Sequence, residues 1–210
     1  GCIRVLFFHA SYRLLDWSLP ELLLESKANG LSTMALAGTR PTDSQGEWDT
    51  KNLEEQQMVT TFISDALIKN GISPVLGDTV SRHAGKVEHL CTPITGSPTN
   101  PLTPGTLASL LHDLSPTPAM CGTPRNLALN VIRNFEHFDR GCYGGFCGPY
   151  RSPSDFSLYV TLRCALVEAD KYCIYTGGGI TLRSDPTSEW EETEIKSTTM
   201  RDSMHIETEC

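Results

Sequence analysis

A glycine triplet followed by an acidic helix, close to the C-terminus, is the feature that most constrains this chain. Gly177-Gly178-Gly179 ends an apolar run, and glycines allow backbone N–H groups to approach an anion closely. Asp185 is a good N-cap and is followed by proline, so a helix is predicted to begin there. On that helix Glu189 and Glu192 are three residues apart and share one face. The order of strand, glycine turn and acidic helix predicts an anion site beside a magnesium ion, although each part alone is also typical of an ordinary turn or helix start.

Composition places the chain among ordinary globular proteins. Its 210 residues are 39% hydrophobic and 20% charged, which predicts one domain with a sizeable core. The net charge of −8 argues against a nucleic-acid or anionic-membrane partner, and no run of 18 apolar residues predicts a membrane span. The eight cysteines form no CxxC pair, so we expect free thiols and a reducing, cytoplasmic compartment.

Hydrophobic patterns in the first half predict strands at residues 3–8, 12–24 and 30–36 and a helix from Lys51 to Asn70. The apolar residues of that helix recur at helical spacing and define its buried face: Val59, Phe62, Ile63, Ala66 and Leu67. Glu55 lies one turn before Val59, on the side predicted to look inward. A carboxylate aimed inward needs a partner, and a magnesium ion is one candidate.

Further strands are predicted at residues 76–83 and 87–94, and a short helix at 106–114. Thr123 and Pro124 predict a capped helix start, and an apolar stripe follows: Leu127, Ala128, Val131, Ile132 and Phe135. Residues 155–167 alternate as one strand with Arg163 on its non-core side, and residues 172–176 are predicted to return as its partner. The polar tail 197–210 is expected to be loosely ordered, which leaves residues 1–196 as the domain.

Four segments, in order, resemble the chorismate-utilising enzymes, the family of isochorismate, salicylate, anthranilate and aminodeoxychorismate synthases. The segments are Leu19-Pro20-Glu21-Leu22, Ala35-Leu36-Ala37-Gly38-Thr39, Lys51-Asn52-Leu53-Glu54-Glu55-Gln56 and Pro116-Thr117-Pro118-Ala119. The first departs from the family pattern, which has serine at the position of Leu19. Ala35 and Asn52 favour the isochorismate branch, most like its menaquinone type, because anthranilate synthases carry proline and glutamate there. The resemblance implies an α/β (α+β) sandwich of largely antiparallel sheets with helices packed outside.

The resemblance also implies roles for individual residues. Glu21 would be the general acid that protonates the departing ring hydroxyl. The magnesium ligands would be Glu55, Glu189 and Glu192. The residues implied to contact chorismate are Gly38, Thr39, His89, Tyr143, Gly144, Arg163, Tyr175, Gly178, Gly179 and Lys196. Without the resemblance, a lone strand histidine such as His89 is more often a core residue, and the glycines beside Tyr143 are equally typical of a plain turn.

The family's activating base is a lysine in a strand well upstream of the segment that holds Glu21, and no such segment occurs in this sequence. The chain moves from Gly1 straight into an apolar run, so we expect the C-terminal part of a longer protein, incomplete at its N-terminal side. Three functions stay open: an isochorismate synthase, another chorismate enzyme of the anthranilate, aminodeoxychorismate or salicylate type, and a non-catalytic chorismate-binding domain. The sequence leaves the oligomeric state unknown.

Overall fold

The computed structural model describes residues 5–9, 12–17, 21–27, 30–84, 87–162, 164–167, 171–182 and 184–204. Contacts divide the chain into two units, where the sequence predicted one domain. Unit 1 comprises residues 1–21, 138–145 and 161–210, and unit 2 comprises residues 22–137 and 146–160. Within the described ranges, none of the helices is both long and apolar enough to cross a bilayer.

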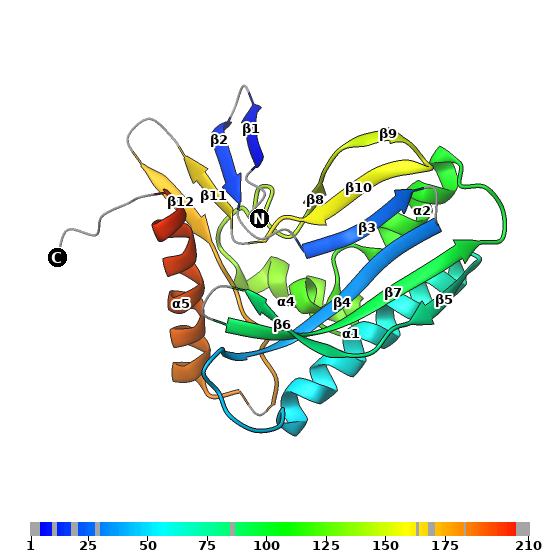
Figure 1. Ribbon diagram of the computed structural model, residues 1–210. Coiled ribbons are helices and arrows are strands. Elements are labelled where there is room, and N and C mark those ends of the chain that lie inside the picture. Colours follow the sequence, from blue (N-terminus) through cyan, green and yellow to red (C-terminus); the bar gives the residue numbers. More distant parts are fainter. Residues whose placement is uncertain are drawn as a thin grey trace. The chain divides into compact units, whose positions relative to one another are not determined.

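Unit 2 is built on an eight-stranded sheet (Figure 1). Six of its strands follow the order β5-β7-β4-β3-β10-β8, while β6 pairs with β7 and β9 pairs with β10. The strands are β3 (Glu21–Lys27), β4 (Gly30–Pro41), β5 (Ile72–Leu76), β6 (Val80–Ala84), β7 (Val87–Pro98), β8 (Phe146–Cys147), β9 (Tyr150–Ser152) and β10 (Asp155–Val160). All the pairings whose registers are determined in this sheet are antiparallel. The longest ladder joins β4 to β7, and it positions most of the candidate site in this unit.

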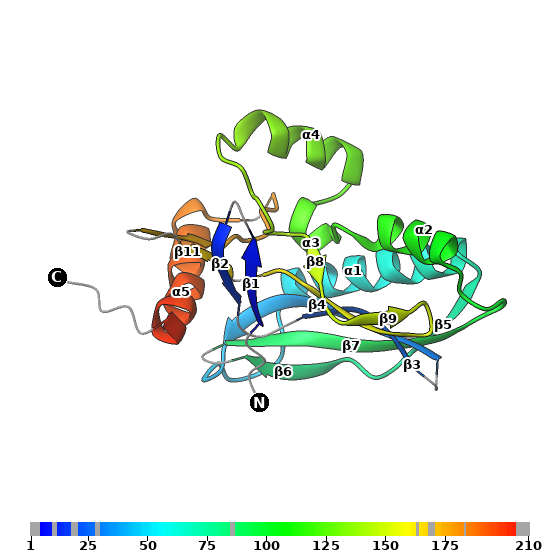
Figure 2. The same cartoon turned by 90° about the horizontal axis from the view of Figure 1, so that it is seen from above.

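Helix α1 (Thr50–Lys69) lies along one face of this sheet (Figure 2). Asp49 caps its first turn by accepting a hydrogen bond from the Asn52 amide, and Gly71 follows the C-cap with a φ of 73°. The core between helix and sheet is apolar and almost fully buried: Leu31, Ala35, Val59, Ile63, Ala66, Leu67, Ile72 and Ile94. Burying each large aliphatic side chain contributes about 1.5–3 kcal/mol, so this layer holds α1 against β4. The helix predicted at 51–70 is therefore confirmed.

Three more helices follow in unit 2: α2 (Pro104–Leu114), α3 (Pro118–Cys121) and α4 (Arg125–Phe135). The first is anchored by Leu107, Leu110 and Leu114, all buried. The predicted cap of α4 is wrong, because Pro124 rather than Thr123 is the N-cap, and it makes no side-chain hydrogen bond. No residue of α4 is buried, so the apolar stripe predicted for this helix is not part of the core.

Unit 1 holds a four-stranded sheet with the order β1-β2-β11-β12 and one long helix. Its elements are β1 (Val5–His9), β2 (Tyr12–Trp17), β11 (Cys164–Val167), β12 (Tyr172–Tyr175) and α5 (Pro186–Met204). As predicted, α5 begins at Pro186 after Asp185, whose carboxylate accepts hydrogen bonds from Ser188. The helix continues eight residues beyond Lys196 with Met200 fully buried, so the loosely ordered tail expected from residue 197 is wrong as far as Met204.

Two predicted strands are each interrupted and contribute to both sheets. Within residues 12–24, β2 of unit 1 ends at Trp17 and β3 of the larger sheet begins at Glu21, and residues 18–20 lie outside the described ranges. Likewise β10 ends at Val160 and β11 begins at Cys164. Between them the Thr161 backbone exchanges hydrogen bonds with Gly144 and Gly145, just before the start of β8. The hairpin of β11 with β12 is confirmed.

Candidate functional site

In unit 2 the candidate site is organised by a bulge at Gly38. The register between β4 and β7 shifts between Ala37 and Thr39, so Gly38 is the extra residue of the bulge. Its φ of 71° lies in the left-handed region that glycine adopts without steric cost. Beyond the bulge Thr39 lies directly opposite His89 in the ladder, and both side chains therefore share one face.

His89 is held by the two residues that the bulge presents. Its Nδ1 lies 3.0 Å from the Gly38 carbonyl oxygen and 3.1 Å from the Thr39 hydroxyl. The imidazole is 8% exposed. The structure thus brings together Gly38, Thr39 and His89, the three residues of unit 2 implied to contact chorismate.

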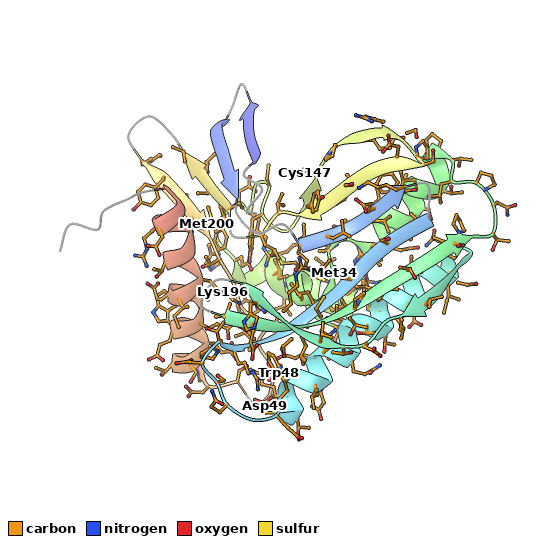
Figure 3. All side chains as sticks on the ribbon, in the orientation of Figure 1. Met34, Trp48, Asp49, Cys147, Lys196 and Met200 are labelled. Atoms are coloured by element: carbon orange, nitrogen blue, oxygen red, sulfur yellow. The ribbon has the colours of Figure 1, made fainter. Side chains whose placement is uncertain are left out.

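A buried ion pair follows in the same strands. Glu88 is 5% exposed, and the Arg40 Nε donates to its carboxylate over 2.5 Å. The Arg40 guanidinium also lies over the Trp48 ring, 4.2 Å from its centroid. This network fixes the loop that leads to Asp49 and α1, and Trp48 and Asp49 are labelled in Figure 3. This ion pair was not predicted from the sequence, since neither Arg40 nor Glu88 belongs to the motifs; the available signal was that the two opposite charges lie in neighbouring predicted strands.

Glu55, the expected metal ligand of unit 2, is half-buried, so its role stays a prediction. The buried polar residues of the first two turns of α1 are Asn52 and Gln56, and they lie on the side of Val59. The Glu55 side chain is 27% exposed and lies 3.9 Å from the Lys51 ammonium, one turn earlier. The buried stripe is therefore centred one position away from Glu55, which leaves this carboxylate at the edge of the stripe.

In unit 1 the candidate site surrounds the loop after β12. The rings of Tyr143 and Tyr175 stack with centroids 5.9 Å apart. A Cβ at Gly177 would lie 2.7 Å from the Tyr143 hydroxyl, so only glycine permits this approach. Gly144, beside Tyr143, has a φ of 78° and donates its N–H to the Thr161 carbonyl. The turn at Gly144, the two stacked tyrosine rings and the glycine loop therefore lie together in one cluster.

Helix α5 adds its acidic face and a lysine to this cluster. Glu189 is 8% exposed, accepts a short hydrogen bond from Ser184, and its Oε2 would lie 3.4 Å from a Cβ at Gly178. Lys196, labelled in Figure 3, lies 2.6 Å from the Glu192 carboxylate and donates to the Gly177 carbonyl over 3.0 Å. Because the lysine bridges helix and loop, it holds the glycine loop against α5.

The pKa of Tyr175 is raised to about 12, mainly by burial and secondarily by the neighbouring Cys173, Cys164 and Asp139. A phenol with such a pKa stays protonated at neutral pH. Its hydroxyl is therefore available as a hydrogen-bond donor toward an anion.

The proposed magnesium ligands have suitable chemistry, since Mg²⁺ prefers carboxylate oxygens. Glu189 and Glu192 belong to unit 1 and Glu55 to unit 2, so their joint use of one ion stays a prediction. Across the ranges that the structure describes, no three His, Cys, Asp or Glu side chains form a group that could hold a metal. Gly179 follows Gly178 in the exposed part of the loop, and Glu21 is the half-buried first residue of β3. Arg163 lies outside the described residues.

Comparison with known proteins gives one family. A family model described as "Chorismate binding enzyme" matches residues 18–205. The isochorismate synthase MenF of Haemophilus influenzae is 33% identical over 207 residues, which are 94% of this chain and 47% of that protein. The isochorismate synthase EntC of Escherichia coli is 32% identical over 197 residues, covering 86% of this chain and 48% of the relative. The chain thus spans about half the length of these relatives.

Solved structures agree on the fold. MenF, the menaquinone-specific isochorismate synthase from Escherichia coli, is 30% identical with a TM-score of 0.85, covering 95% of this chain and 48% of that one. Anthranilate synthase component I from Streptococcus pneumoniae, at 20% identity and a TM-score of 0.78, shares the fold alone. The predicted mixed α/β class, with antiparallel sheets and helices, is confirmed.

Proposed function

The chain belongs to the family of chorismate binding enzymes, and from this premise we propose that it takes part in converting chorismate to isochorismate for menaquinone biosynthesis. The observation that carries the proposal is the match over residues 18–205 together with relatives that are isochorismate synthases at about one-third identity. The reaction is an isomerisation in which water adds at ring carbon C2, the ring double bonds shift, and the hydroxyl of C4 leaves as water once it is protonated.

Chorismate carries two carboxylates, and unit 1 offers groups for one of them. The Gly178 and Gly179 amides, the protonated Tyr175 hydroxyl and the Arg163 guanidinium would bind the carboxylate of the enolpyruvyl side chain. Lys196 supports this loop through the Gly177 carbonyl. The stacked pair of Tyr143 and Tyr175 supplies an apolar flank for a flat ring.

The second carboxylate needs a positively charged partner, because the chain as a whole has a net charge of −8. We infer that Glu55, Glu189 and Glu192 would hold Mg²⁺ there, since hard oxygen ligands suit this ion. When bound, the metal would neutralise the ring carboxylate and stabilise charge that develops during substitution. The ion pair of Lys196 with Glu192 shows that this acidic face already accepts one positive group.

Proton transfer would be divided between two groups. Glu21 at the start of β3 would protonate the departing hydroxyl. The matching base, a lysine in the family, has no counterpart among the residues of this sequence. A positioned base is worth roughly a hundred- to ten-thousand-fold in rate, so the 210-residue chain should bind chorismate but convert it slowly or not at all.

The test combines calorimetric titration with chorismate, with and without Mg²⁺, and a product assay. Binding that requires Mg²⁺ supports the proposal, and loss of at least about 30-fold in affinity is expected for Arg163→Ala, which removes a charge-assisted pair. Arg151→Ala is the matched control, because that arginine is 85% exposed and pairs only weakly with Asp155. Unchanged affinity in the Arg163 variant would remove this residue from the site.

The product assay separates the alternatives. Isochorismate identifies the synthase, and rapid formation would show that another residue acts as the base. Anthranilate formed with ammonia would move the chain to the lyase branch. Tight binding without any product favours a chorismate-binding domain, whereas no binding refutes the proposal.

A further inference from the structure

Lys196 contacts both helix α5 and the glycine loop of unit 1. Its Nζ lies 2.6 Å from Oε1 of Glu192, one turn earlier on the helix, and donates to the Gly177 carbonyl over 3.0 Å. The lysine side chain is 16% exposed and that of Glu192 is 33% exposed. Because the bond to Gly177 also holds the ammonium, this pair is more confined than an ordinary pair between two solvent-exposed side chains.

Glu192 is also one of the carboxylates assigned to Mg²⁺ under the proposed function. It shares one face of α5 with Glu189, three residues earlier, and both offer oxygens of the kind that Mg²⁺ prefers. We call these two carboxylates the acidic face of α5. The face fits the ion by its ligand chemistry, and Lys196 already places a positive charge against it.

The lysine and the ion would repel each other if both were bound to Glu192. Mg²⁺ binds carboxylate oxygens at about 2 Å, which would place its two charges within roughly 5 Å of the Lys196 ammonium. Water screens this repulsion only in part, because both side chains are at least two-thirds buried. Binding of the ion to Glu192 therefore opposes the ion pair that the structure shows.

We propose that Lys196 is the resident cation of the acidic face of α5, and that Mg²⁺ binds Glu192 only by displacing it. The affinity for the ion is then limited by the pair of Lys196 with Glu192, which the bond to Gly177 supports. Without the ion, the lysine neutralises one carboxylate of a face that would otherwise repel an anionic substrate. The inference rests on the magnesium site of the proposed function, and two measurements distinguish failure of the site from failure of the competition.

The first measurement is calorimetric titration of the full chain with Mg²⁺, at constant ionic strength and without chorismate. Lys196→Met removes the ammonium and keeps an unbranched side chain, so its affinity for Mg²⁺ should rise about three- to tenfold above that of the native chain. Lys196→Arg restores a positive charge and should return the affinity to within about twofold of the native value. Arg201→Met is the matched control, because Arg201 lies on the same helix but pairs with Glu194 over 3.8 Å. This control removes the same charge and should also stay within about twofold.

The second measurement follows the Lys196 ammonium itself in ¹H–¹⁵N spectra of the lysine side chains, with its signal assigned by its loss in Lys196→Arg. In the native chain, Mg²⁺ should shift this signal with the same midpoint as the calorimetric titration, because the ammonium leaves Glu192. Lys69 is the internal control, since it pairs with Asp113 in unit 2 over 2.8 Å and should keep its signal.

The outcomes separate the two ideas. Equal Mg²⁺ affinity in the native chain and Lys196→Met, or an equal gain in Arg201→Met, refutes the competition and keeps the magnesium site. Bound Mg²⁺ with an unmoved Lys196 signal refutes the displacement. If neither the native chain nor Lys196→Met binds Mg²⁺, the magnesium site of the proposed function is wrong and the inference falls with it. Competition in a chain that binds no chorismate would refute the proposed function and keep the role of Lys196.

Discussion

Replacing Gly38 by alanine should destabilise unit 2 by two effects that the structure separates. A non-glycine residue at a φ of 71° costs about 1–2 kcal/mol. The new Cβ would also lie 3.1 Å from the Asn52 side chain and 3.3 Å from the Asn52 carbonyl oxygen, inside a layer with no spare volume. Overpacking of this kind costs about 1–3 kcal/mol, so the total loss should be about 2–5 kcal/mol.

Gly71 provides the matched control, because its φ is 73° and nothing lies within 4 Å of a Cβ built there. Gly71→Ala should therefore lose only the backbone part, about 1–2 kcal/mol. Urea unfolding of both variants gives the free energies, and calorimetry gives chorismate affinity, expected to fall only for Gly38→Ala. Equal losses of stability in the two variants would show that the Asn52 contact contributes nothing, and the steric reasoning would then be refuted.

Two further changes probe unit 1 and the acid stability of unit 2. Gly177→Ala places a Cβ 2.7 Å from the Tyr143 hydroxyl, so the ring must move, and chorismate affinity should fall at least about tenfold by calorimetry; native affinity would exclude the loop from the site. Hydrogen bonds from Lys27 and then Ser157 lower the pKa of Glu25 from its ordinary 4.5, so its contribution to stability is present above about pH 4.5 and is lost as the pH falls through the lowered pKa. Ser157→Ala should weaken this loss in acid unfolding curves, and an unchanged curve would contradict the assignment.

Local signals predicted local structure well. Asp185 with Pro186 located the start of α5, and the apolar spacing from Val59 to Leu67 located α1 and its buried face. Both depend on neighbours within a few residues, which the sequence displays directly. The glycine loop and the two glutamates of α5 were likewise predicted side by side, and Glu189 does lie next to Gly178.

Features that depend on distant partners were not predictable in the same way. The alternation over residues 155–167 indicates a strand but not that its two halves join different sheets, because each half pairs with strands that lie elsewhere in the sequence. Nothing in the sequence indicated that Asn52 contacts Thr39, which lies thirteen residues earlier. Helical spacing locates a buried stripe only to within about one position, so it could not predict that Glu55 lies at the half-buried edge of the stripe.

Helix α4 shows where periodicity stops being informative. Leu127, Val131 and Phe135 recur every four residues as a buried stripe would, yet they are 65%, 54% and 74% exposed. Periodicity reports the side of a helix on which apolar groups gather, whereas burial requires a second surface, and the sequence of the helix carries no information about that surface. The same difference between a local pattern and a distant partner applies to the proposed site. The bulge and the glycine loop each lie within one unit, whereas the proposed magnesium ion would need Glu55 from one unit and Glu189 and Glu192 from the other. The pattern of each helix therefore predicts the type of ligand that the helix carries, and the shared ion stays a prediction.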